Sequence, residues 1–138
     1  MIGFLSQLGG IMFLLMLLHF VADWMTQTEK IAVHKHDDWH VRSVHCTIYT
    51  LCFLPILFFM PLYSVAAVMS FLTLWISHFV LDSYVPVWAW ARYIRRPDMP
   101  VLTWMKTQLG CIIFIVVDQI FHILFLLVPA TFIILNSK

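Results

Sequence analysis

Four long apolar stretches separated by polar connections dominate this sequence of 138 residues. The stretches lie at residues 3–25, 43–60, 65–84 and 105–134. Each comes close to, or exceeds, the roughly 20 apolar residues that a helix needs to cross a bilayer. The polar connections are 27–42 and 86–104, and a short turn near Pro61 separates the second stretch from the third. The pattern predicts an all-α, integral membrane four-helix transmembrane bundle, with a single domain over residues 1–138.

Composition places the chain outside the soluble globular proteins. Hydrophobic residues make up 62% of the chain and charged residues 11%, whereas soluble domains carry about 25% charged residues. The mean hydropathy is +0.93. The first apolar stretch is not preceded by basic residues, so we expect a retained span rather than a cleaved signal peptide. The sequence has no basic patch of the kind that binds phosphate backbones, and we expect no nucleic-acid partner.

Basic residues are concentrated in the two polar connections and at their borders. Seven of the eight lysines and arginines lie there, and only Lys138 lies on the opposite side. Because cytoplasmic loops carry the excess of lysine and arginine, we expect both connections in the cytoplasm and both termini on the non-cytoplasmic side. Segment 86–104 is also rich in tryptophan, which favours a position along the membrane surface. The expected location is the bacterial inner (cytoplasmic) membrane, with several passes.

Three histidine–aspartate pairs lie within the apolar stretches, each with a spacing of four residues. They are His19/Asp23, His78/Asp82 and, in reversed order, Asp118/His122. This spacing places both members of a pair on one helix face. In the expected orientation the pairs lie at overlapping depths in the cytoplasmic half, and the reversed pair belongs to a span that runs the other way. His45 opens the second stretch near the cytoplasmic edge, so every span contributes a polar side chain to one region.

Charged side chains inside a bilayer need compensation. An aspartate at the centre of a span costs about 2.5–3.5 kcal/mol on insertion scales, so such residues face a ligand, a packed interior or water. Imidazole nitrogens and carboxylate oxygens are ligands of divalent metals. We expect zinc first, with manganese, iron or magnesium as alternatives. The predicted metal ligands are His19, Asp23, His45, His78, Asp82, Asp118 and His122.

A metal near cytoplasmic water lowers the pKa of a bound water and produces a hydrolytic nucleophile. Catalysis would then use Asp23 and Asp118 as ligands or general bases. Gln27 lies four residues after Asp23 and is an accessory candidate, and Lys35 is a candidate anion contact at the entrance to the site. The other histidines of the first connection are expected on a charged, flexible surface: His34, His36 and His40.

Several motifs occur in a characteristic order over nearly the whole chain. They are HFVADWMTQT from His19, then Lys35 and Trp39, HCTIYTLCFLP with Tyr49 and Pro55, SHFVLD, and VDQIFH with Gln119. Their order and spacing resemble a small family of bacterial and phage membrane proteins, domain-of-unknown-function family 3307. The resemblance implies one site for the histidine, aspartate and glutamine positions, and it implies no activity. The chain differs from the family pattern at Glu29, Lys30 and HKHDD.

The residues and the resemblance lead to a hypothesis of metal-dependent hydrolysis of a lipid, a lipid-linked group or another membrane-proximal ester or phosphoester. A looser similarity to membrane-bound metal-dependent hydrolases favours it by analogy. Two alternatives stay open: a proton or ion pathway, and a phage-type accessory protein whose polar cluster is structural and which acts on a membrane partner. The lipid bilayer is the expected partner, and a homo-oligomer is consistent with so small a bundle.

Overall fold

The computed structural model describes residues 2–57 and 65–136, which form helices and turns with no strand among them. In chain order the elements are α1 (Ile2–Phe20), η1 (Val21–Met25), α2 (Glu29–His34), α3 (Trp39–Leu51), α4 (Leu54–Leu57), α5 (Val65–Leu81), α6 (Val85–Trp90), η2 (Ala91–Arg95), α7 (Val101–Met105), α8 (Gln108–Phe125) and α9 (Leu127–Asn136). The two η elements are π-helical turns, wider than an α-helix. The prediction of an all-α chain is confirmed.

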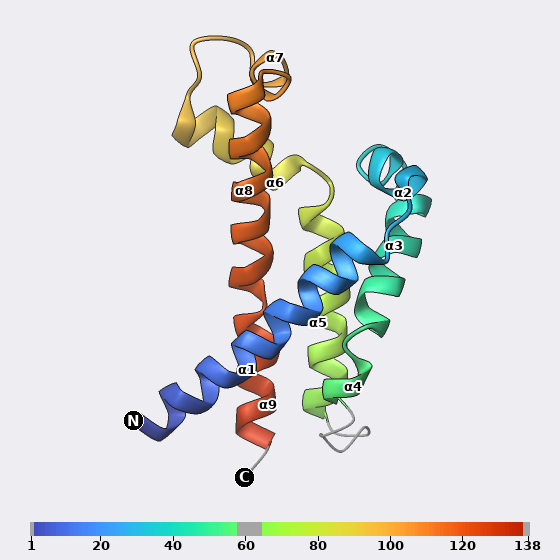
Figure 1. Ribbon diagram of the computed structural model, residues 1–138, viewed down its shortest axis with the longest axis vertical. Coiled ribbons are helices and arrows are strands. Elements are labelled where there is room, and N and C mark those ends of the chain that lie inside the picture. The colour runs from blue at the N-terminus through green and yellow to red at the C-terminus, as the bar shows by residue number, and fades with distance from the viewer. Residues whose placement is uncertain (1, 58–64, 137–138) are drawn as a thin grey trace.

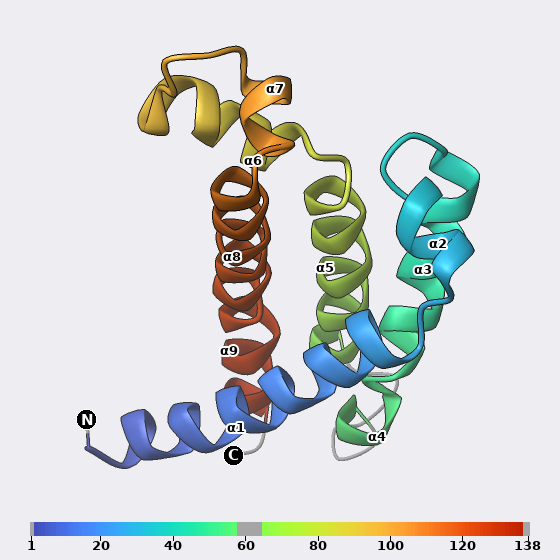
Figure 2. The same cartoon turned by 45° about the horizontal axis from the view of Figure 1, so that its top comes forward.

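Helix α5 lies beside α8, and α9 continues the line of α8 (Figures 1 and 2). Helix α1 crosses this pair obliquely and contacts α9, while α3 packs on α5 and carries α2 beside it. The segment from α6 to α7 covers one end of α8. His19 and Asp23 lie at the end of α1 and in η1, His78 and Asp82 lie at the end of α5 and directly after it, and Asp118 and His122 lie in the half of α8 that precedes α9.

Two helical stretches, Gly3–Met25 and Gln108–Leu135, are long and apolar enough to cross a membrane. Helices Val65–Leu81 and Val85–Arg95 pass the same test together, but an angle of 55° separates them, so they add a third span only if the bent pair counts as one. The expected second span is represented by α3 and α4, and its last residues, 58–60, lie outside the described residues together with the turn near Pro61. Membrane association is therefore supported, and the count of four spans stays a prediction.

Stripes of apolar side chains cover the outside of the long helices. Residues spaced by four along α5 and α8 are exposed, and they are Val68, Leu72, Ile76 and Val80 on α5 and Ile112, Val116, Ile120 and Leu124 on α8. Exposed apolar surface of this extent is rare on soluble monomers. It suits contact with lipid.

Prolines and capping residues explain where the helices begin and end. Pro55 and Pro129 have no N–H to donate one turn back, and the breaks after α3 and α8 precede them. Helix α2 begins after Thr28, whose Oγ1 accepts a hydrogen bond from the backbone of Ile31 at 3.3 Å. Helix α8 begins after Thr107 in the same way. These residues therefore divide the long apolar stretches into shorter helices.

Candidate metal centre

Four side chains from three segments converge on one buried point. Asp23 lies in η1, His45 in α3, His78 in the last turn of α5 and Asp82 directly after it. All four are at most 2% exposed. The Nε2 atom of His45 lies 3.1 Å from Oδ1 of Asp23 and 3.3 Å from Oδ2 of Asp82. The Nε2 atom of His78 lies 3.6 Å and 3.3 Å from the same oxygens, and 3.0 Å from Nε2 of His45.

These separations resemble the edges of a tetrahedral metal site. Zinc bonds of about 2.0–2.2 Å place ligand atoms about 3.3–3.6 Å apart in a regular tetrahedron. The five separations here run from 3.0 to 3.6 Å. Oδ2 of Asp82 has no aligned hydrogen bond from the described residues, although three nitrogens lie within 3.3 Å of it. An oxygen in these surroundings is suited to bind a cation.

Lys35 places its amine against the same cluster. Nζ lies 3.1 Å from Oδ1 of Asp23, 3.2 Å from Oδ2 of Asp82 and 3.3 Å from Nε2 of His45. Burial alone would lower the pKa of Lys35, but the carboxylates of Asp82 and Asp23 outweigh burial and raise this pKa above its ordinary value. The amine is therefore charged. Two carboxylates and one ammonium leave one negative charge uncompensated among these groups.

The residues after α2 are fastened to α5 and α3 by two side chains for which the sequence indicated no role. His36 donates from Nδ1 to the carbonyl oxygen of Asp82 at 2.8 Å, and its ring stacks on Tyr84 with centroids 3.6 Å apart. Arg42 donates to the carbonyl oxygens of Lys35 at 2.8 Å and His36 at 2.6 Å. Burial lowers the pKa of His36, which favours the neutral ring. These bonds hold the ammonium of Lys35 in register with the carboxylates.

His19, a predicted ligand, has both ring nitrogens engaged by other side chains. Nδ1 lies 3.0 Å from Oη of Tyr49, and Nε2 lies 2.9 Å from Oε1 of Gln119. The amide nitrogen of Gln119 lies 3.3 Å from Oδ2 of Asp23 and 3.3 Å from Oδ2 of Asp118, and carboxylates accept hydrogen bonds. This assignment makes Nε2 of His19 a donor and Nδ1 an acceptor. His19 thus connects to Asp23 through Gln119, outside the four-atom group.

Asp82 also belongs to a second group, with Asp118 and His122 of α8. Candidate ligand atoms of these three residues lie within 4.8 Å of one another. The Nε2 atom of His122 lies 3.7 Å from Oδ1 of Asp82, and its Nδ1 lies 3.6 Å from Oδ2 of Asp118. The structure therefore brings six of the seven predicted ligands into two groups that share Asp82.

A cleft of about 430 Å³ reaches the cluster from outside. Its polar lining residues are Asp23, Gln27, Lys35, His36, Asp118 and Gln119. Its apolar lining residues include Trp24, Met105, Phe114 and Ile115. Gln27, the accessory candidate, lines the cleft, and its buried Oε1 has no hydrogen-bond partner in the described part of the chain. Small polar and apolar groups of one ligand can therefore approach the cluster together.

His36 and Tyr49 were not among the predicted site residues, and Gln119 was assigned to the site only through the family resemblance. Tyr49 and Gln119 stand within the motifs of the family resemblance, and Tyr49 follows a predicted ligand by four residues, so a signal was present. His36 has no comparable signal, because its role depends on the carbonyl of a residue far along the chain. The expectation of an exposed surface holds for His34 and His40 and is wrong for His36, which is partly buried.

A family model described as "Protein of unknown function (DUF3307)" matches residues 11–138. The chain belongs to this family. The family assignment predicted from the motifs is thus confirmed, and the matched range contains both groups of candidate ligands. No curated protein and no solved structure matches the chain. The looser similarity to membrane-bound metal-dependent hydrolases stays a prediction.

Proposed function

We propose that this chain is a multi-pass membrane protein that binds a divalent metal ion at Asp23, His45, His78 and Asp82, and that it hydrolyses an ester or phosphoester at the membrane. The observation that carries the proposal is the set of separations of 3.0–3.6 Å among four buried donor atoms. Two imidazole nitrogens and two carboxylate oxygens suit zinc first. A cation also offsets the negative charge that Lys35 leaves uncompensated.

The proposed setting is the inner membrane of a bacterium. Two helices long and apolar enough to cross a membrane support a membrane location, as do the exposed apolar stripes of α5 and α8. In this proposal the chain crosses four times, with connections 27–42 and 86–104 in the cytoplasm. The concentration of basic residues in these connections supports that orientation.

The cleft supports a substrate that is apolar at one end and anionic at the other, such as a lipid or a lipid-linked phosphoester. Its apolar lining residues can contact an acyl chain, while the ammonium of Lys35 attracts negative charge. A divalent metal bound by the histidines and aspartates beside the cleft would supply Lewis acidity and would lower the pKa of a bound water. Asp118 also lines the cleft and is the carboxylate that an attacking water can reach.

Metal content is the first test of this function. Protein from zinc-supplemented cells, purified in detergent without chelators, is analysed by elemental mass spectrometry. We expect wild type to retain zinc and His45→Ala to lose the ion held by His45. His34→Ala is the matched control, because His34 is an exposed histidine at the end of α2 and is not among the candidate ligands. A zinc-free wild type that takes up no divalent ion on dialysis would overturn the proposal.

Hydrolysis is tested separately on the metal-loaded protein in mixed lipid–detergent micelles. Release of phosphate, fatty acid or headgroup from membrane lipids is followed by mass spectrometry. We expect product from wild type and less than a tenth of that rate from Asp118→Asn. A metal-loaded protein that releases no product from carboxylic or phosphoric esters would overturn the hydrolase and retain the metal centre.

A proton pathway is the second candidate, and a hydrogen-bonded chain favours it. This series of hydrogen bonds runs from Tyr49 through His19 and Gln119 to Asp23. Proton relays in membranes use aspartate and histidine side chains, and His19 and Asp23 are two such groups. Proteoliposomes with an internal pH dye measure the flux directly. A proton flux that disappears in Gln119→Leu would support this candidate. A flux through wild-type vesicles no greater than that through protein-free vesicles would exclude it.

A further inference from the structure

His122 carries a buried ring nitrogen that the described residues leave without a partner. Its Nδ1 lies 2.9 Å from the carbonyl oxygen of Asp118, one helical turn earlier. Because a carbonyl only accepts, Nδ1 carries the proton and Nε2 presents a lone pair. Nε2 has no hydrogen-bond partner, and His122 is 3% exposed. A buried acceptor in this state is costly unless a proton donor or a cation faces it.

The group that faces this nitrogen is the carboxylate of Asp82. The distance from Nε2 of His122 to Oδ1 of Asp82 is 3.7 Å, too long for a hydrogen bond with any placement of the proton. A lone pair and a carboxylate oxygen at this separation are brought together favourably by a cation between them. The other oxygen of Asp82, Oδ2, is the one that faces His45 and His78. Asp82 therefore presents one oxygen to each group.

Asp118 completes the second group and differs from the first group in exposure. Its side chain is 21% exposed and lines the cleft, whereas the carboxylates of Asp23 and Asp82 are almost fully buried. Its candidate ligand atom lies within 4.8 Å of those of Asp82 and His122. The second group thus combines a buried imidazole with a carboxylate that substrate and water can reach.

We propose that Asp82, Asp118 and His122 bind a second divalent cation, and that Asp82 bridges two ions through its two oxygens. The proposal rests on the proposed function, because Asp82 is a ligand in both sites. Four protein ligands close the first site, as in structural zinc sites, while three leave one coordination position open on the second ion. Of the three residues Asp118 lines the cleft, so an exchangeable water would reach the second ion from that side. Carboxylate-bridged metal pairs about 3.5–4 Å apart are common in hydrolytic enzymes.

Titration with Mn²⁺ tests the second site without any assay of activity. Metal-free protein in detergent is loaded, passed through a desalting column and analysed for bound manganese per chain. We expect two ions in wild type, one in His122→Ala, one in His45→Ala and none in Asp82→Ala. Asp118→Asn is a milder change at a partly exposed position, and it should lower the affinity for the second ion by about tenfold or more. His34→Ala, exposed and outside both groups, should bind as wild type does.

Electron paramagnetic resonance separates a bridged pair from two independent ions. Wild type loaded with Mn²⁺ should give an exchange-coupled spectrum, and both one-ion variants should give the signal of isolated Mn²⁺. A wild type with one ion, lost in His45→Ala and kept in His122→Ala, would overturn the second site and leave the proposed metal centre intact. One ion lost in either variant would also overturn it, because the two groups would then hold a single ion. A wild type that binds no ion would overturn both proposals.

Discussion

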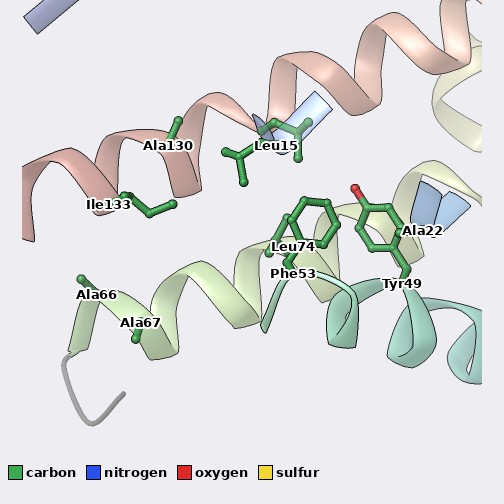
Figure 3. Packing of buried hydrophobic residues seen from close by; sticks show 10 residues of the cluster. Leu15, Ala22, Tyr49, Phe53, Ala66, Ala67, Leu74, Ala130 and Ile133 are labelled. Atoms are coloured by element: carbon green, nitrogen blue, oxygen red, sulfur yellow. The ribbon is translucent and has the colours of Figure 1, made fainter. Parts of the chain in front are cut away.

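The helices of this protein have two contrasting halves. In the half away from α2, buried contacts are apolar and involve Leu15, Leu74, Ala130 and Ile133, with Ala66 and Ala67 on α5 (Figure 3). In the other half, the same helices bury His19, His78 and His122 at no more than 3% exposure. Close packing holds the first half together, whereas hydrogen bonds and ion pairs hold the second.

This contrast follows from the properties of lipid as a solvent. Apolar side chains gain little by leaving lipid for a protein interior, so the apolar half depends on close contact, which small residues such as alanine permit. Charged side chains lose a great deal in lipid, so each one in the polar half needs a partner. Changes in the polar half should therefore be costly, and changes in the apolar half should have graded effects.

The largest effect is expected when the one buried ammonium of the described cluster is removed. In Lys35→Met, the carboxylates of Asp23 and Asp82 lose their ion-pair partner at 3.1 and 3.2 Å. Breaking a buried pair by removing one member costs about 3–5 kcal/mol. We expect a loss of this size in the free energy of unfolding, measured in detergent with chelator present. Lys30→Met, at an exposed position of α2, is the control and should change the free energy of unfolding little.

Zinc should reverse much of this loss. The ammonium of Lys35 lies within 3.3 Å of three candidate ligand atoms, so its removal takes away a competing positive charge. We expect Lys35→Met to bind zinc more tightly than wild type and to regain stability as zinc is added. Equal destabilisation with and without zinc would show that Lys35 is the sole counter-ion of the cluster and that the polar half is a metal-free network.

The sequence predicted the polar half better than its internal connections. Spacing and topology were enough to bring Asp23, His45, His78 and Asp82 to one level, because each lies near the same end of its apolar stretch. Spacing could not show that His19 turns to Tyr49 and Gln119. His19 lies in α1 and Asp23 in the π-helical turn Val21–Met25, so the spacing of a regular α-helix does not describe how the two side chains are placed.

The helix boundaries were harder to predict than the site. Hydropathy alone joins α8 and α9 into one long stretch, although a turn at Leu126, ahead of Pro129, separates the two helices. The bend between α5 and α6 depends on the left-handed backbone of Tyr84, with φ of 64°, which an ordinary tyrosine rarely adopts. Composition could not reveal either feature, because both depend on single residues.

An intermediate effect is expected in the apolar half. Leu74 is 2% exposed and packs in the apolar core one turn before His78. Leu74→Ala leaves a cavity, but lipid removes most of the transfer penalty, so we expect about 2 kcal/mol, at the low end of the range for such changes. Leu72→Ala on the exposed face of α5 is the matched control and should cost less than about 0.5 kcal/mol. Equal losses in the two variants, measured by unfolding in detergent, would contradict a packed apolar half.

The smallest effect on stability is expected at Asp38, a carboxylate exposed to water outside both halves. Asp38 begins α3 and accepts hydrogen bonds from the backbone of His40 at 2.8 Å and Val41 at 3.3 Å, which lower its pKa. Its contribution to stability is therefore complete above the ordinary carboxyl pKa of about 3.9 and disappears as pH falls through the lowered folded-state pKa. We expect Asp38→Ala to melt slightly below wild type at pH 7, with the gap closing in acid. Asparagine also caps helices but does not titrate, so Asp38→Asn should have a higher melting temperature than Asp38→Ala at every pH. A gap between wild type and Asp38→Ala that stays constant down to pH 3 would show that the charge at this cap stabilises nothing.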